Sequence, residues 1–244
     1  MTDLAFMVRE DWAQEGTAMA ANGAVIREWL GGDPILFAVG DASKFDDHHR
    51  NADADTAQLI TGTQQRPQVV SIADLPHLTD KGNIPVAAVL HPYAESDCET
   101  IREVVDAGLV GRLFVMVWAS HELIRVWMEG RGAVNLHTGS PCPGLEPVQV
   151  AAAGMMVGEE YNGLDTGVGK DTVVGLLRAF TTADYPLDRD VWLRCYFAAG
   201  GSFRHADAIE KFIKQMKAGT THRVNQRFRD NIIEVLRHQV AESA

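Results

Sequence analysis

Short apolar runs, separated by polar or glycine-rich stretches, dominate the first 140 positions of the chain. Turn-forming residues bound these runs, and several of the runs contain β-branched residues, a pattern that predicts buried strands. The predicted strands are 35–39, 68–72, 85–90, 113–118 and, more weakly, 133–137. A single helix from 112 to 129 also fits the fourth run. Continuous apolar character at 85–90 indicates burial on both faces, which favours parallel pairing.

Helical spacing of apolar residues extends from Ala5 to Leu30 with a break at 21–23, and it predicts two short helices. A better-defined helix follows the third predicted strand. There Ser96 is a candidate N-cap, and Glu99 lies at the position of its capping-box partner. Ser120 is a candidate cap for a further helix that ends near residue 129.

Beyond residue 150 the strand signal fades, and periodicity predicts helices at 171–181, 189–199, 205–218 and 222–241. The last of these has a predicted core face of Val224, Phe228, Ile232 and Val235. The whole pattern predicts an α/β fold: a mostly parallel sheet of about four to five strands flanked by helices, with a helical C-terminal third. We expect a sheet region at 1–150 and a helical region at 151–244 that packs on it as a single domain.

Charge is uneven along this acidic chain, which has a formal net charge of −11. Residues 1–203 hold 14 Lys and Arg against 28 Asp and Glu, whereas residues 204–244 hold 8 against 5. Because an acidic body repels phosphate backbones, we expect no nucleic-acid partner. No apolar segment approaches the roughly 18 residues that span a bilayer, so we expect no membrane partner. A small-molecule substrate is the predicted partner, and self-association as a homo-oligomer is left open.

Cysteine usage bears on the compartment. Cys98, Cys142 and Cys195 are an odd number of widely spaced thiols without a CxxC pair, which predicts free thiols in a reducing environment. Acidic residues run through the first apolar stretch, unlike a secretory signal. We therefore expect a cytoplasmic protein.

Two stretches begin like ligand-binding motifs but lack required residues. Five residues separate Gly163 from Gly169, and Asp171 stands where a phosphate-binding loop needs Ser or Thr for magnesium. The same stretch lacks the third glycine of a dinucleotide fingerprint. His121 opens a zinc-protease pattern, but Arg125 replaces its second histidine. The sequence therefore implies no firm cofactor, although a divalent metal such as zinc is left open.

Polar residues gather directly after the predicted strands, where parallel α/β sheets place their functional groups. The candidate catalytic residues from these loops are Cys98, His91, His121 and Glu122. The candidate substrate-binding residues are Asp41, Tyr93, Glu95 and Cys142. The hypothesis requires that the chain near positions 41, 91 and 121 converges at a common rim.

Cys98 is the most specific of these candidates. At the second position of its predicted helix, free N–H groups and the helix dipole favour a thiolate, although Asp97 and Glu99 oppose ionisation. His91 lies seven residues upstream and would act as a base or a cationic partner. This arrangement predicts a small-molecule enzyme with hydrolase, lyase or isomerase chemistry.

Three alternatives remain open. His48 and His49, with His91 and His121, would form a zinc or iron centre of a hydrolase or lyase. Cys98 and Cys142 would face each other across a substrate as two bases, as in racemases. In the third alternative the chain is a non-catalytic subunit that binds a ligand or serves assembly.

Overall fold

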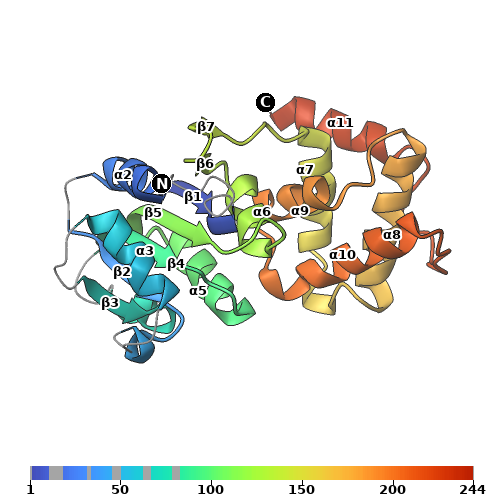
Figure 1. The fold of residues 1–244 in the computed structure, drawn as a ribbon. Coiled ribbons are helices and arrows are strands. Elements are labelled where there is room, and N and C mark those ends of the chain that lie inside the picture. The colour runs from blue at the N-terminus through green and yellow to red at the C-terminus, as the bar shows by residue number, and fades with distance from the viewer. Residues whose placement is uncertain are drawn as a thin grey trace. The chain divides into compact units, whose positions relative to one another are not determined.

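The computed structural model describes residues 2–10, 19–31, 34–45, 51–62, 67–78 and 83–243 (Figure 1). The chain divides into two compact units, residues 1–142 and residues 143–244. Each unit is described by itself below. The expectation that a helical region from residue 151 packs on the sheet as part of one domain stays a prediction.

The first unit contains a seven-stranded sheet in the order β3-β2-β4-β5-β1-β6-β7. Neighbouring strands pair in parallel, except for the antiparallel pair β6 and β7. The strands are β1 (Asp3–Val8), β2 (Leu36–Val39), β3 (Gln68–Ser71), β4 (Ile84–Leu90), β5 (Val110–Val117), β6 (Val134–Asn135) and β7 (Ser140–Pro141). The predicted α/β class with a mostly parallel sheet is confirmed, and the sheet has more strands than the four to five expected.

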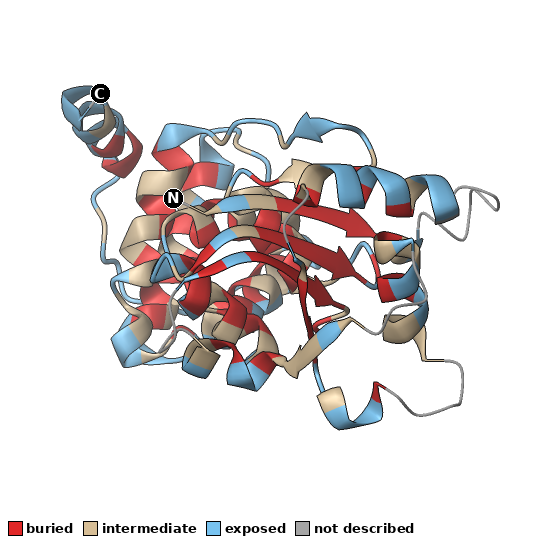
Figure 2. Ribbon diagram, turned by 90° about the vertical axis from the view of Figure 1, so that its left-hand side faces the viewer, coloured by how far each residue is buried: buried red, intermediate tan, exposed pale blue. Residues whose placement is uncertain are grey.

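The prediction of a helix at the start of the chain is wrong, because residues 3–8 form β1. This strand pairs with β5 on one side and β6 on the other, and Ala5, Phe6, Met7 and Val8 are all buried. A short continuous apolar run of this kind suits a strand covered on both faces as well as it suits a helix. Figure 2 shows the central strands of the sheet almost entirely buried.

Helices α2 (Met19–Leu30) and α3 (Ala52–Thr61) pack together on one face of the sheet. Ile26 and Leu30 of α2 and Ile60 of α3 share one hydrophobic core with alternate residues of the central strands. Helix α2 runs without a break through 21–23, unlike the prediction. Gly23 lies in α2 where the two helices approach closely, because a Cβ added at Gly23 would lie 2.4 Å from the carbonyl oxygen of Leu59 in α3.

Short helical elements and two longer helices complete the first unit. These are η1 (Ala42–Lys44), η2 (Ile72–Asp74), α4 (Leu75–Leu78), α5 (Glu95–Asp106) and α6 (Leu123–Gly130). Helix α5 buries Ile101, Val104 and Val105 along one side, as its apolar stripe predicted.

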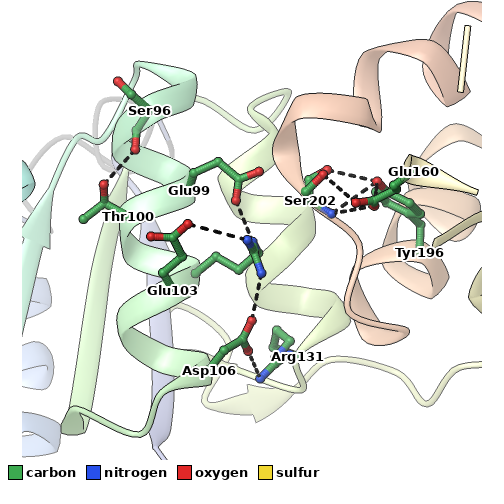
Figure 3. Close-up of polar contacts among 10 residues, drawn as sticks. Ser96, Glu99, Thr100, Glu103, Asp106, Arg131, Glu160, Tyr196 and Ser202 are labelled. Carbon is green, nitrogen blue, oxygen red and sulfur yellow. Dashed lines mark hydrogen bonds and ion pairs between the residues drawn. The ribbon is translucent and has the colours of Figure 1, made fainter. Parts of the chain in front are cut away.

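The predicted caps of α5 and α6 are wrong. Ala94 is the N-cap of α5 and provides no side-chain cap, so Ser96 lies inside the first turn. Glu99 pairs with Arg102 at 2.5 Å and does not reach back to the helix start. Arg102 also contacts the carboxylates of Glu103 and Asp106 (Figure 3). Glu99, the predicted capping-box partner, therefore belongs to this charge network. Helix α6 likewise begins after Glu122, two residues later than a Ser120 cap implies.

The second unit is helical. Its elements are α7 (Pro147–Val157), η4 (Glu160–Asn162), α8 (Gly167–Thr182), α9 (Arg189–Ala198), α10 (Phe203–Lys217) and α11 (Ile232–Ser243). The predicted helices at 171–181, 189–199 and 205–218 are confirmed as α8, α9 and α10. Helix α7 was not predicted. Its Ala- and Gly-rich sequence starts at Pro147 and shows little contrast between faces.

The prediction of a helix from residue 222 is wrong over its first ten residues, because α11 begins at Ile232. The stretch 219–231 forms no regular helix. Tertiary contacts hold it in this shape: the Asn225 amide donates to the Asp171 carboxylate at 2.8 Å, and the Phe228 ring lies against Gly175. Val235, predicted for the core, is 40% exposed.

Helices α9 and α10 meet at a buried polar cluster around Glu160 (Figure 3). The Tyr196 hydroxyl donates to Glu160, and Glu160 also accepts from the Ser202 amide at 2.9 Å and the Ser202 hydroxyl at 3.0 Å. Tyr196 is fully buried, and its hydroxyl also lies 3.1 Å from the Ser202 carbonyl, so its polar partners all belong to this cluster among the described residues. The cluster therefore fixes the α9–α10 junction relative to η4.

Replacing Gly23 by Ala is expected to destabilise the protein by about 1–3 kcal/mol, because the new methyl group meets backbone atoms of α3. Gly154→Ala in α7 is the matched control, since a Cβ there meets nothing within 4 Å. The control is expected to stabilise by about 0.5–1 kcal/mol through helix propensity. Urea unfolding monitored by circular dichroism measures both changes. The same sign for both variants would contradict the close approach.

Tyr196→Phe is expected to cost about 1–3 kcal/mol of unfolding free energy, because it leaves part of the buried Glu160 cluster unsatisfied. Tyr161→Phe serves as control, since Tyr161 is 95% exposed. Thermal and urea unfolding of both variants provide the measurement. A Tyr196→Phe protein as stable as the Tyr161→Phe protein would show that the hydroxyl does not support the junction.

Candidate functional site

The carboxyl ends of β1, β2, β4 and β5 are level with one another at one edge of the sheet. Val8 of β1 pairs with Val117 of β5, and Leu90 of β4 pairs with Met116. The residues that follow these strands, among them Arg9, His91 and Trp118, therefore emerge side by side. The chain after β2 runs to the outer strand β3, whereas the chain after β4 runs the other way to β5. In open parallel sheets a ligand usually binds in a crevice at such a reversal, which here lies between β2 and β4.

His91 lies at the centre of this edge. Its Nδ1 is 2.6 Å from Oδ1 of Asp53, and its Nε2 is 3.5 Å from Nη1 of Arg9. A guanidinium only donates hydrogen bonds, so the ring nitrogen that faces Arg9 accepts, and we assign the ring proton to Nδ1. Asp53 therefore accepts from Nδ1–H and fixes the orientation of the imidazole. The His91 side chain is only 8% exposed.

Arg9 joins three elements at this edge. Its Nη1 donates to the Thr56 hydroxyl at 2.5 Å and to the carbonyl of Ala52 at 3.0 Å, both in α3. Its guanidinium lies 5.3 Å from the centre of the Trp118 ring, and the same ring meets His91 edge to face at 4.9 Å. Trp118 is nevertheless 49% exposed, so one side of this aromatic wall is open to solvent.

The backbone of His91 is strained. Its φ of 46° lies in the left-handed region, which histidine adopts rarely and at a cost of roughly 1–3 kcal/mol. The neighbouring strand stabilises this conformation, because the His91 amide still donates to the carbonyl of Met116 at 2.9 Å. The strain directs the imidazole toward Asp53 at the point where the strand ends.

Cys98 lies in a different environment from the one predicted. Helix α5 starts at Glu95, so Cys98 is the fourth helical residue, and its amide already donates to the carbonyl of Ala94. The second-position placement is therefore wrong, and the free N–H groups of the helix start do not face the sulfur. The thiol is buried, and burial, followed by the nearby Asp97 carboxylate, raises its pKa to about 12. These conditions favour the neutral thiol.

His121 and Glu122 lie beside Trp118, on the β5 side of the edge. His121 is exposed, and Oε2 of Glu122 accepts from the backbone amide of Trp118 at 3.1 Å. Glu10, which follows Arg9, accepts from the amide and hydroxyl of Ser120, both at 3.1 Å. The hydrogen bond from the Ser120 backbone is the main reason that the pKa of Glu10 is lowered. Two carboxylates thus organise the loop that follows β5.

The candidate substrate-binding residues differ in their polar contacts and in their exposure. Asp41 accepts from the amide and hydroxyl of Ser43 and pairs with Lys44 at 3.0 Å, and these contacts, the Ser43 hydroxyl first, lower its pKa. Tyr93 is 89% exposed, and Glu95 is an exposed residue of the first turn of α5. Asp41, Tyr93 and Glu95 follow β2 or β4, the two strands on either side of this reversal.

Cys142 lies apart from this reversal. It follows β7, which is separated from β4 by β5, β1 and β6. At ordinary strand spacing this separation is roughly 19 Å. Cys142 is half-buried, and the arrangement disfavours the two-thiol alternative, in which Cys98 and Cys142 face one substrate.

His48 and His49, the predicted metal ligands, lie outside the described residues. Within the described ranges, no group of three or more His, Cys, Asp or Glu side chains is arranged to hold a metal ion. The zinc hypothesis stays a prediction. Within the same ranges, no helix is both long enough and apolar enough to cross a bilayer.

Sequence reasoning missed Arg9 and Asp53. Arg9 was assigned to the interior of a helix, and its position at the end of β1 became evident only when β1 entered the sheet. Asp53 belongs to a polar stretch, 41–63, for which no helix was predicted, whereas it lies in the first turn of α3 behind the Asn51 cap. The cap Asn51 followed by Asp53 and Asp55 is the local signal that would have indicated this helix.

Iodoacetamide at about pH 7.5 is expected to modify Cys98 and Cys195 at least tenfold more slowly in the folded protein than in urea. Burial raises the pKa of Cys98 to about 12 and that of Cys195 to about 11, so little thiolate exists near neutral pH. Half-buried Cys142 is the internal comparison and is expected to react faster. Peptide mass spectrometry measures the three rates. Rapid native alkylation of Cys98 would restore it as a candidate nucleophile.

Comparison of the chain with protein-family models, curated proteins and solved structures finds no match. The case for a function therefore rests on the arrangement of the side chains themselves. Within that arrangement, the contacts among Asp53, His91 and Arg9 are the feature with the clearest chemical meaning.

Proposed function

We propose that this chain is a small-molecule enzyme in which His91 transfers a proton to or from a substrate bound in the crevice between β2 and β4. The observation that carries the proposal is the 2.6 Å contact between Nδ1 of His91 and the Asp53 carboxylate. A carboxylate in this position fixes the tautomer and leaves Nε2 as the basic nitrogen. This is the orientation that proton-transfer enzymes require.

The second support is the long contact on the other side of the ring. Nε2 of His91 lies 3.5 Å from Nη1 of Arg9, at the outer limit of a hydrogen bond. An anionic or carbonyl group of a substrate would compete for the Arg9 guanidinium and release Nε2. Arg9 would then neutralise negative charge that develops in the reaction, while Trp118 forms an apolar wall.

The strained backbone of His91 also agrees with a functional role. Left-handed histidines are uncommon, and strain of this kind is concentrated at sites where geometry matters more than stability. Asp41, Tyr93, Glu95, His121 and Glu122 border the same edge and would contact the substrate. The proposal covers hydrolase, lyase or isomerase chemistry in the cytoplasm, with self-association as a homo-oligomer left open.

A non-catalytic role is the second candidate. Both ring nitrogens of His91 already face a partner, Asp53 on one side and Arg9 on the other, as in a polar network that only stabilises a fold. In that case the half-exposed Trp118 would serve to bind a ligand without reaction. Turnover separates the two candidates.

The proposed test incubates the purified protein with a defined mixture of organic acids, amino acids, phosphate esters and thioesters, followed by mass spectrometry. At least one compound is expected to be consumed, and His91→Gln is expected to slow that reaction about 10²–10⁴-fold, the usual contribution of an acid–base group. His77→Gln, which alters an exposed histidine of α4, is the matched control and is expected to react at the wild-type rate.

Thermal unfolding of each variant shows whether a lost reaction reflects lost folding. Asp53→Asn gives a second measurement, because it keeps the volume of the side chain but weakens the orientation of the ring. It is expected to reduce the rate and to alter its pH profile. An absence of turnover, or equal turnover by the His91→Gln and His77→Gln proteins, would refute the proposed acid–base role.

A further inference from the structure

The second unit contains a groove with a volume of about 480 Å³ between α8 and the irregular segment 224–230. Three apolar side chains line it, Val224, Phe228 and Ile232, together with Ala179 of α8. Its volume falls within the range of about 300–1,000 Å³ that is usual for small-molecule sites. The groove belongs wholly to residues 143–244 and is independent of the function proposed above.

The walls of the groove are fixed by specific contacts. Asn225 is bonded to Asp171, and the Arg227 guanidinium pairs with Glu159 at 2.9 Å. Nη2 of Arg178 donates to the backbone carbonyl of His222 at 3.0 Å and so ties α8 to the segment. A segment held at these points presents a preformed surface, which lowers the cost of ordering it on binding.

Phe228 adds a close contact on the floor. A Cβ added at Gly175 would lie 3.3 Å from its ring, so the absence of a side chain in α8 makes room for the aromatic group. The ring therefore packs against α8 at Gly175 and is one of the residues that line the groove.

The charged residues of the lining are mostly cationic. Arg178, Arg227 and Arg229 line the groove, and Asp230 is the acidic residue among the lining residues. Arg178 and Arg227 are engaged as described, whereas among the described residues the Arg229 guanidinium has no ion-pair or hydrogen-bond partner. Such an excess of positive charge is unusual in a chain with a net charge of −11.

Neighbouring groups indicate the same local potential. Burial and, after it, the positive charges of Lys170, Arg178 and Lys211 lower the pKa of His222, which lies against Phe212 at the base of the segment. Three cations thus act on one imidazole. An anion is the ligand that this potential favours.

We propose that this groove binds a small organic anion: its carboxylate or phosphate group is held by Arg229 and Arg178, and its apolar body lies against Phe228. Guanidinium groups recognise both kinds of oxyanion through paired hydrogen bonds. The apolar floor excludes a fully hydrated inorganic ion as the best ligand, because such an ion leaves Phe228, Val224 and Ile232 without a partner.

The test uses 8-anilinonaphthalene-1-sulfonate as a fluorescent apolar anion and the uncharged N-phenyl-1-naphthylamine as its neutral counterpart. The native protein is expected to bind one sulfonate probe per chain, with an affinity that falls as salt is added. The neutral probe is expected to bind roughly tenfold more weakly, because it lacks the group that the arginines recognise.

Arg229→Gln is the main variant, since its side chain makes no ion pair or hydrogen bond with the described residues, and it is expected to weaken sulfonate binding roughly tenfold. Arg223→Gln removes the same charge from the same segment but outside the groove lining, so it is the matched control and is expected to bind normally. Competition by benzoate and by phenyl phosphate then distinguishes a carboxylate ligand from a phosphate ligand. Equal binding of both probes, or equal loss in the Arg223→Gln and Arg229→Gln proteins, would overturn the proposed site.

Discussion

Insertion of β1 between β5 and β6 is the constraint on which the arrangement of the first unit depends. It converts the start of the chain into a central strand, and its register with β5 brings Val8 level with Val117. Arg9 then emerges beside Trp118, and the β4–β5 register brings His91 to the same height. Because Ala5 to Val8 are buried on both faces, it is the paired register with β5, and not an alternation of apolar and polar residues, that sets the position of Arg9.

The polar cluster that results is held by backbone geometry as much as by its hydrogen bonds. His91 adopts a strained φ, and Asp53 reaches it from the first turn of a helix that lies 38 residues earlier in the sequence. Burial of a carboxylate and an imidazole costs free energy unless each is paired, and here they pair with each other. Nη1 of Arg9 lies 3.5 Å from the remaining ring nitrogen and also bonds to α3. The cluster therefore links the sheet to α3 and still presents one aromatic side to solvent.

The sequence predicted the strands at the centre of the sheet, because β2, β4 and β5 are short continuous apolar runs, although a helix over 112–129 also fitted the run of β5. It was insufficient for β1, whose four buried residues also match a helical period. It predicted His91 at the edge of the sheet but not its partners, since the contacts to Asp53 and Arg9 span 38 and 82 positions. Contacts of that range depend on strand order, which local patterns do not encode.

The predicted starts of α5 and α11 are both wrong, and each error changes the chemical interpretation of nearby side chains. A start of α5 at the predicted Ser96 cap, two residues after the actual Ala94 cap, would have left Cys98 near free N–H groups, whereas the thiol of Cys98 is buried near Asp97. The ten residues before α11 have the apolar period of a helix. In the irregular conformation, however, Asn225 and Phe228 contact α8. A helix from residue 222 would exchange these contacts for internal backbone hydrogen bonds. Local propensity is a weak preference of tenths of a kcal/mol per residue, and a half-buried aromatic ring with a charge-assisted hydrogen bond outweighs it. The irregular path that follows from this balance places the Arg229 guanidinium at the groove, where it has no ion-pair or hydrogen-bond partner in the described part of the chain. The same competition between local and tertiary preferences therefore explains both the wrong helix prediction and the cationic surface.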